Sequence, residues 1–469
     1  MSSFIAIVFI AVAVLFILGI KLLSSPKTAR YGNLLAAFGM LVALIATLPL
    51  LNSGSESSAQ QGWTLNYTLM IVGIVIGLII GAIGAYSVKM TAMPQMVALF
   101  NGVGGGAAAL VASLEFLRRA NSPEGITTFF AITMLFATLI GSLSFSGSII
   151  AFLKLQGHLE KPHTFPGQNI LNGLILLVIL GLCAYLTGWA TTNPTAFVAM
   201  FVLALVFGVA MVMPIGGADM PVVISLLNSF TGLAVAADGF TINNISMIVA
   251  GTLVGSSGTL LTLLMCKAMN RPVTNVLFGA FGSATSGGGA AGKTVKPIQA
   301  DEAALLLSYA SQVVIVPGYG MAVAQAQHQV RELSDELGKR GVEVQFAIHP
   351  VAGRMPGHMN VLLAEANVPY DQLIEMEAIN PTMDRVDVCL VIGANDVVNP
   401  AAREDKSSPI YGMPIIEADR AKTVIVMKRS MAAGFAGIEN LLFYKDNTRM
   451  LFGDAKASLN ALVAAVKAG

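Results

Sequence analysis

Long apolar runs fill the first 270 residues of the chain and limit what it can fold into. About 20 consecutive apolar residues in a helix span the bilayer core, which is roughly 30 Å thick. The runs lie near residues 4–20, 32–51, 67–87, 94–117, 126–153, 170–190, 196–213, 219–237 and 244–266. The sequence therefore predicts a polytopic α-helical membrane domain at residues 1–270, with nine transmembrane helices in contact with the lipid bilayer.

Basic residues in the connecting loops predict the orientation of these helices, because Lys and Arg gather on the cytoplasmic side. The loops on one side hold Lys21, Lys27, Arg30, Lys89, Lys154, Lys161, Lys267 and Arg271. The loops on the other side hold Arg118 and Arg119. Since an odd number of spans puts the two termini on opposite sides, we expect the N-terminus outside and the C-terminal region in the cytoplasm. The first run has no basic residue before it, so we interpret it as a helix and not as a signal peptide.

A cytoplasmic α/β domain is predicted at residues 303–469, after a Gly-rich hinge or linker at 271–302. Nearly continuous apolar runs alternate there with helical patterns, which is typical of a Rossmann-like parallel sheet covered on both faces. Strand-like runs lie at 313–316, 342–348, 386–392, 423–427 and 450–452, and helical patterns at 321–339, 357–367, 370–378 and 455–467. The net charge of +1 provides no basic stripe for nucleic acid. The cysteines show no metal-ligand spacing, so no metal site is expected.

Polar and glycine residues follow the predicted strands, at the edge where parallel sheets bind ligands. The loops are Gly318–Gly320, His349–His358, Gly393–Asp396, Lys428–Ser430 and Gly434–Gly437. A glycine turn between strand and helix is itself weak evidence, because many such turns use glycine only to pack. Four strand-end loops at one edge, with Gly434–Gly437 beyond the last of them, favour a dinucleotide site.

The charges at this edge favour NADP(H) over NAD(H). A fold selective for NAD places an acid after the second strand, whereas here Ile348 is followed by His349. Lys428, Arg429 and Ser430 instead offer two cations and a hydroxyl, which suit a 2′-phosphate. The alternative is a solvated basic pair. Asp396 and His349 can titrate near the cofactor, or can simply tie down their loops.

A few polar residues interrupt the apolar runs, where each needs a partner or water. Asn101 and Asn228 lie towards mid-depth of their helices, Ser148 adds a hydroxyl, and Asp219 opens the eighth run. These residues either hold helices together by hydrogen bonds or line a hydrated path for a proton. Asparagine does not release a proton, so such a path would need water or another titratable group.

The motifs at both ends of the chain resemble one family, the β subunit of bacterial proton-translocating NAD(P) transhydrogenase. In the soluble half they are Val316–Gln327, Ile348–Arg354, Pro356–Ala366, Val391–Asp396, Lys428–Ser430 and Leu451–Lys456. In the membrane half they are Gly216–Val222, Leu227–Gly232, Val254–Gly258 and Met265–Asn270.

The resemblance implies a Re/Si-specific enzyme that reduces NADP⁺ with NADH and couples the reaction to inward proton movement across a bacterial inner membrane. NADP(H) would bind this chain, NAD(H) would bind a separate α subunit, and the assembly would be α2β2. Asp396 would be the coupling acid, with His349 beside it. The implied cofactor-binding residues are Gly318, Tyr319, Gly320, Ala322, Val323, Arg354, Gly393, Ala394, Asn395, Asp396, Lys428, Arg429, Ser430, Gly434, Phe435, Ala436, Gly453, Asp454, Ala455 and Lys456. Asn101, Asn228, Asp219 and Ser148 would line the proton path.

Two positions depart from the family pattern. Some members have histidine where this chain has Asn101, and others have tyrosine in the nucleotide lid where it has Phe435. The first departure leaves open which group carries the proton. The alternative function is a nucleotide-sensing ion channel or transporter with a regulatory Rossmann domain.

Overall fold

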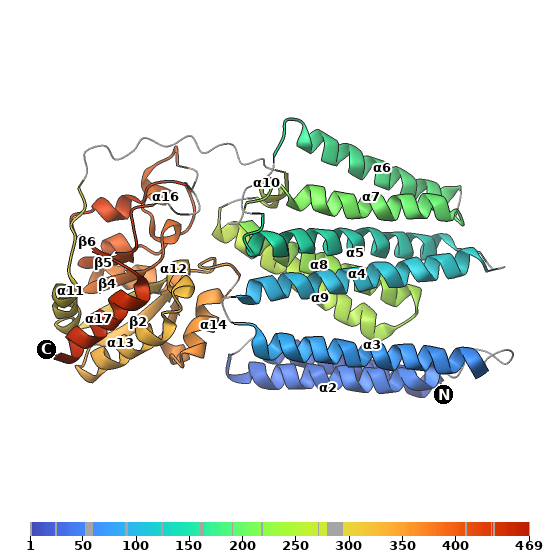
Figure 1. The fold of residues 1–469 in the computed structure, drawn as a ribbon, viewed down its shortest axis with the longest axis horizontal. Coiled ribbons are helices and arrows are strands. Elements are labelled where there is room, and N and C mark those ends of the chain that lie inside the picture. The colour runs from blue at the N-terminus through green and yellow to red at the C-terminus, as the bar shows by residue number, and fades with distance from the viewer. Residues whose placement is uncertain are drawn as a thin grey trace. The chain divides into compact units, whose positions relative to one another are not determined.

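The computed structural model describes residues 2–23, 26–51, 60–89, 92–122, 125–159, 164–189, 191–216, 219–270, 272–278, 294–355, 357–408, 410–432, 434 and 437–468. The chain divides into two compact units, one made of most of the apolar helices and one that contains the whole parallel sheet. We refer to these parts as the membrane helices and the sheet domain (Figure 1).

Within the described residues, nine helices are long and apolar enough to cross a membrane, which confirms the predicted fold class. They are α1 (Ser2–Leu23), α2 (Pro26–Leu51), α3 (Gln60–Ser87), α4 (Met93–Ala120), α5 (Thr128–Leu155), α6 (Gln168–Gly188), α7 (Pro194–Val212), α8 (Met220–Thr241) and α9 (Ile245–Ala268). A short helix, α10 (Val273–Phe278), follows them.

Small residues let the membrane helices approach closely. A Cβ atom on Gly141 of α5 would lie 2.7 Å from the carbonyl oxygen of Gly105 in α4. The same holds between α8 and α9, where a Cβ on Gly251 would lie 2.6 Å from the carbonyl oxygen of Gly232. Backbone therefore packs on backbone in both helix pairs, and the polar side chains beside these contacts come within reach of the neighbouring helix.

The sheet domain holds six strands within the described residues, all paired in parallel in the order β3-β2-β1-β4-β5-β6. They are β1 (Gln312–Pro317), β2 (Glu343–Ile348), β3 (Leu373–Glu375), β4 (Val388–Ile392), β5 (Thr423–Lys428) and β6 (Thr448–Phe452). This is the strand order of a doubly wound dinucleotide fold, and the all-parallel pairing confirms the predicted Rossmann-like sheet. The order reverses between β1 and β4, so a crevice forms where their carboxyl ends meet.

Alternating side chains bury both faces of the sheet. Val314, Val391 and Val426 point into one core, which is closed by the buried side chains of Met376 and Phe443. The opposite face is covered by α11 (Ala300–Ser308), α13 (Gln327–Lys339) and α17 (Ala455–Ala468), which pack together beside the strands (Figure 1). Shorter turns complete the domain: α12 (Tyr319–Val323), α14 (His358–Glu365), η3 (Tyr370–Gln372), α15 (Met376–Ile379), η4 (Asn380–Arg385), η5 (Asp396–Val398), α16 (Ala401–Glu404), η6 (Ala418–Arg420) and η7 (Leu441–Tyr444).

Two of the predicted helical patterns differ from the structure. The continuous helix expected at 370–378 is wrong, because Leu373–Glu375 instead extend the sheet as β3 beside β2, between the single turn η3 and the short helix α15. Pairing with an open strand edge outweighs helix propensity here. The helix expected at 321–339 is interrupted between α12 and α13, where Gln325 adopts a φ of 50°.

Residues before the first strand also belong to the sheet domain. Met450 of β6 donates its N–H to the Lys296 carbonyl (2.8 Å), and the N–H of Ile298 donates to the Met450 carbonyl (3.0 Å). The segment 294–302, part of the expected linker, therefore runs along β6 and leads into α11. Residues 279–293 of that linker lie outside the described residues.

Glycine backbones meet at the carboxyl ends of β1 and β4. Gly318 donates its N–H to the Ile392 carbonyl and Gly320 donates to the Gly393 carbonyl, both at 2.9 Å. A Cβ on Gly393 would lie 2.4 Å from the Gly320 Cα, and Gly393 has a φ of +64°. These two turns therefore touch through bare backbone, and no side chain fits between them.

We predict that Gly393→Ala destabilises the chain by on the order of 3 kcal/mol, because a methyl group must displace backbone and take an unfavourable φ. The measurement is thermal or urea unfolding of the purified chain in detergent. The matched control is Gly338→Ala in α13, where an added Cβ meets nothing within 4 Å. The control is expected to be neutral or to stabilise the helix by about 0.5–1 kcal/mol. Equal stability of the two variants would contradict the backbone contact.

Candidate functional site

A cavity opens at the carboxyl edge of the sheet, beyond β1, β4 and β5. Most of the predicted cofactor-binding residues meet there. Those that line it are Gly318, Tyr319, Gly320, Val323, Gly393, Ala394, Asn395, Asp396, Lys428, Arg429, Ser430, Gly434, Gly453, Asp454 and Ala455. Ala322, Arg354, Lys456 and His349 are not part of that lining. Phe435 and Ala436 lie outside the described residues.

The floor of the cavity is formed by glycine backbone, and the N–H groups of that backbone do not point at the cavity as free hydrogen-bond donors. The N–H groups of Gly318 and Gly320 are already used to bind the β4 loop, so these glycines contribute by leaving room for a ligand. At the far side, Gly453 follows β6 with a φ of +150° and donates its N–H to the Lys428 carbonyl (3.1 Å). Asp454 then caps α17, because its Oδ1 accepts from the N–H groups of Lys456 and Ala457, both at 3.1 Å.

Arg354 is held at the rim by contacts of its side chain and its backbone. Its guanidinium lies over the Tyr319 ring, 4.6 Å from the ring centroid. Its backbone N–H donates to Nδ1 of His358 (3.0 Å), a buried histidine that the sequence analysis did not single out. Gly353, with a φ of +107°, leaves the space that this imidazole occupies. A planar cation fixed in this way suits recognition of a phosphate.

His349 is buried behind the cavity and is tied to backbone through both ring nitrogens. Nε2 lies 2.9 Å from the Pro414 carbonyl, and Nδ1 accepts from the N–H of Val351 (3.2 Å). Burial lowers the pKa of His349 below its usual value, although the Pro414 carbonyl and Glu377 oppose that shift. The ring is therefore neutral at physiological pH, and its geometry suits a tie between two loops.

The two cations of the Lys428–Ser430 triplet after β5 have different surroundings: Lys428 contacts neighbouring groups of the chain, whereas Arg429 is exposed. Lys428 donates to the Ala432 carbonyl and lies over the Phe443 ring, 4.9 Å from the ring centroid. Burial lowers the pKa of Lys428, an effect that the Asp396 carboxylate partly offsets. Arg429 and Ser430 are exposed at the cavity. Among the described residues no ion pair involves Arg429, so its guanidinium is available to an anion.

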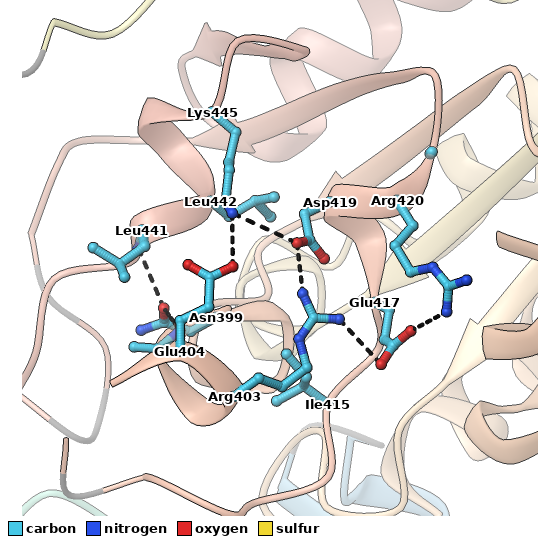
Figure 2. Close-up of polar contacts among 12 residues, drawn as sticks. Asn399, Arg403, Glu404, Ile415, Glu417, Asp419, Arg420, Leu441, Leu442 and Lys445 are labelled. Atoms are coloured by element: carbon cyan, nitrogen blue, oxygen red, sulfur yellow. Dashed lines mark hydrogen bonds and ion pairs between the residues drawn. The ribbon is translucent and has the colours of Figure 1, made fainter. Parts of the chain in front are cut away.

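Asp396 begins η5 and is positioned by asparagines on neighbouring segments. Asn440 donates to the carbonyl oxygen of Asn395 (2.9 Å) and to its Oδ1 (3.1 Å). Asn399 donates to the Glu439 carbonyl (3.0 Å). It also accepts from the N–H of Leu441 (3.2 Å), as Figure 2 shows. Asn399 and Asn440 are 0% and 1% exposed. The Asp396 loop is thus fastened to the segment that follows Gly437.

A network of ion pairs reinforces this connection (Figure 2). Arg403 contacts Glu417 (3.0 Å) and Asp419 (2.6 Å), while Lys445 contacts Glu404 (2.7 Å) and Asp419 (3.8 Å). Single ion pairs at a surface contribute little, but a network with a largely buried centre holds its segments in one arrangement. Asp419, whose side chain is 9% exposed, is that centre. The sequence contained no signal for this set, because its members are far apart along the chain.

In the membrane helices, the structure brings Asn101 and Ser148 together. Asn101 Nδ2 donates to Ser148 Oγ (3.0 Å), and Ser144 lies within 3.4 Å of the same nitrogen. Ser144 also lies 2.6 Å from Thr231 Oγ1 of α8. Within the described residues, no hydrogen bond joins Asn228 to this group. Asp219 is buried at the start of α8, separated by about three helical turns from Thr231.

Apolar spanning helices and a doubly wound parallel sheet with a polar switch-point cavity define a membrane protein that carries a dinucleotide-type domain. Residues 5–465 match the family model described as NAD(P) transhydrogenase beta subunit. A Rhodospirillum rubrum protein named NAD(P) transhydrogenase subunit beta is 50% identical over 467 residues, covering 98% of each chain. A second R. rubrum sequence of the same name, from a defined strain, gives the same identity and coverage. The chain therefore belongs to the NAD(P) transhydrogenase beta subunit family.

We predict that the loop containing Arg354 loses protection from hydrogen exchange at acidic pH, because His358 becomes protonated there. Burial and the nearby Arg354 cation lower the pKa of His358 from 6.5 to about 4, so this histidine is neutral and accepts the Arg354 N–H at pH 7. A lowered folded-state pKa means that the contribution to stability is present above about pH 6.5 and is lost as the pH falls towards 4. The loss is on the order of 2–3 kcal/mol.

Hydrogen exchange of residues 351–358 in the purified chain, corrected for intrinsic rates, measures this loss of stability. His358→Asn keeps an acceptor but does not titrate, so its protection should be flat over this range. A flat profile in the unmodified chain would refute the assignment.

Proposed function

We propose that the chain binds NADP(H) in the cavity beyond β1, β4 and β5 and works with an α subunit that carries NAD(H). The observation that carries this proposal is that Arg429, Ser430, Asp396 and the Gly320–Gly393 contact all border one cavity at the switch point. The residues suit the cofactor: bare glycine backbone admits a close approach, and an open guanidinium beside a hydroxyl suits a phosphomonoester. Family membership supports the use of nicotinamide dinucleotides and the need for an α partner.

Selection of NADP(H) over NAD(H) rests on the ends of β2 and β5. No acid follows β2 to accept from a ribose hydroxyl, because Ile348 leads into the buried His349. Arg429 and Ser430 would hold the 2′-phosphate directly. Lys428 would hold it through its charge, and a bound phosphate would favour the protonated form that burial opposes.

When bound, the two nicotinamides supply the hydride chemistry, in which NADH reduces NADP⁺ with Re/Si specificity. The chain's own residues bind and orient NADP(H) and hold a titratable carboxyl beside it. Asp396 would exchange a proton as the cofactor changes redox state, while Asn440 and Asn399 keep its loop in place. Arg354 would steady the phosphates, and His349 would act through its loop.

Proton coupling is proposed to run through the membrane helices. Asn101, Ser148, Asn228 and Asp219 would line an inward path in a bacterial inner membrane, with the N-terminus outside and the sheet domain in the cytoplasm. The buried cluster of Asn101, Ser144, Ser148 and Thr231 supports a polar route across α4, α5 and α8. The assembly would be α2β2, with residues 1–270, 271–302 and 303–469 as membrane domain, hinge and NADP(H)-binding domain. The family match favours this function over a nucleotide-sensing channel.

We predict that the double variant Lys428→Ala, Arg429→Ala loses discrimination between NADPH and NADH. Each charge-assisted contact with the 2′-phosphate contributes about 1.5–3 kcal/mol, so affinity for NADPH should fall by roughly 100-fold or more, while that for NADH changes little. Calorimetric titration of the purified chain with both nucleotides is the measurement. The charge-matched control is Arg331→Ala, Lys339→Ala on α13, whose cations pair with Asp335 and Glu336. Retained preference for NADPH would place the 2′-phosphate elsewhere.

We predict that Asp396→Asn still binds NADP(H) but loses proton-coupled turnover. The amide keeps the size of the carboxylate but cannot exchange a proton, so steady-state reduction of NADP⁺ by NADH should fall by about 100-fold or more. The assay uses the complex with the α subunit in liposomes and follows both hydride transfer and internal pH. A variant with unchanged turnover and an unchanged pH profile removes Asp396 from this role. No hydride transfer by the unmodified complex would instead favour a nucleotide sensor.

A further inference from the structure

One carboxylate lies inside a membrane helix and has no polar contact there. Asp238 of α8 is 1% exposed, and neither of its oxygens has a hydrogen-bond partner among the described residues. An ionised carboxylate in such surroundings costs several kcal/mol or more, whereas the protonated acid costs far less. The structure is therefore compatible with Asp238 only as a neutral carboxylic acid, which carries one proton.

Asp238 lies on the face of α8 that packs against α4 and α5. Thr231 precedes it by two helical turns and contacts Ser144 of α5, while Thr241 follows it by one turn and donates to Thr133 of α5 (3.1 Å). Because α5 runs antiparallel to α8, these two contacts put Asp238 level with residues 136–137 of α5. The packing of Ala237 against Ala137 and Ala112 agrees with that alignment.

Unpaired polar atoms also occur on α5 and in the Asn101 cluster. Thr138 Oγ1 and Ser142 Oγ are buried without a hydrogen-bond partner among the described residues, on the face of α5 that carries Ser146 towards Gly208 of α7. Asn101 Oδ1 on α4 is buried and unpaired in the same sense. Thr231 lies about 10 Å along the helix axis from Asp238. Buried hydroxyl and carbonyl groups of this kind bind ordered water, and water together with hydroxyls conducts protons.

The other carboxylate of the described membrane helices is already ion-paired, which leaves Asp238 as the unpaired acid. Among the described parts of α1–α9, the carboxylates are Glu115 of α4 and Asp238. Glu115 is held in an ion pair with Arg119 (2.6 Å). Arg119 also donates to the Thr241 carbonyl (3.3 Å) and lies over the Phe130 ring. The cations of α5 and α9, Lys154 and Lys267, lie in the last turns of those helices, towards the Asp219 end.

We propose that Asp238 is a proton-binding residue of the membrane path, the titratable group that Asn101 cannot provide. This inference rests on the proposed proton coupling. In the step, the O–H bond of Asp238 breaks, and its proton passes to a water or hydroxyl oxygen on the Thr231 side. The carboxylate that remains is buried without a partner, so it is a short-lived state of high free energy. It then takes a proton from the aqueous phase at the Thr241 end, which restores the acid, so neither oxidant nor reductant is needed.

The test compares Asp238→Asn, Asp238→Glu and the unmodified chain, each with the α subunit in liposomes that contain a pH-sensitive dye. Asp238→Asn should bind NADPH normally and transfer hydride in a single turnover within about twofold of the unmodified complex. Its steady-state turnover and proton uptake should both fall at least about tenfold. Asp238→Glu should restore most of the uptake, with a shifted pH–rate profile, because it keeps the acid. A group that only fills space would give the reverse order, with the amide better tolerated than the longer acid.

An infrared spectrum of the complex provides a readout that does not depend on turnover. The unmodified complex should show the carbonyl band of a protonated carboxylic acid that shifts in D2O and is absent from Asp238→Asn. Absence of such a band overturns the assignment even if the variant folds poorly. The control is Ser246→Ala, which removes a buried hydroxyl that donates to the Phe9 carbonyl at the same end of the helices. A comparable loss of uptake in this control would attribute the effect to packing and overturn the assignment.

The outcomes separate the two proposals. Hydride transfer without proton uptake in the unmodified complex would overturn the proposed coupling. Uptake at the unmodified rate by Asp238→Asn, with uptake by the unmodified complex intact, would overturn only the role of Asp238.

Discussion

The contact between the Gly320 and Gly393 backbones is the interaction on which the candidate site depends. It brings the turn after β1 against the turn after β4, and two N–H to carbonyl hydrogen bonds hold them there. Since no side chain fits between the two turns, the floor of the cavity is bare backbone. Every functional side chain must then come from the surrounding loops, and those loops need supports of their own.

The supports are buried side chains that bind backbone. His358 holds the backbone of Arg354, His349 joins two loops, and Asn440 holds the carbonyl of Asn395 beside Asp396. Each uses a neutral group to fix a loop that carries a charged residue. A neutral support can be buried at low cost, while the charged group remains at the cavity. The arrangement explains why His349 and His358 face backbone and not the cavity.

The sequence allowed the class of fold and the edge of the site to be predicted, because both follow from local patterns. Apolar length predicted the membrane helices, and the strand-end loops predicted an edge at which Asp396 and Arg429 line one cavity. Features that depend on contacts between residues far apart in the sequence could not be predicted from local patterns. The strand β3 forms because β2 offers an open edge, and Asn399 bonds to Leu441, 42 residues further along the chain. Asp238 lies outside the predicted spans for a simpler reason. The eighth apolar run ends at residue 237, just before the acid, whereas the helix continues to Thr241.

The composition of the membrane helices limits how a proton could cross them. The amide of Asn101 and the hydroxyls of Ser144, Ser148 and Thr231 can rearrange hydrogen bonds, but each has one protonation state near neutral pH. Net transfer requires at least one group with two states of similar free energy. A buried acid without a partner meets this requirement if its ionised form is needed only briefly. Asp238 is such an acid. Asn101 has no second protonation state near neutral pH, and the proposed role of Asp238 would supply one.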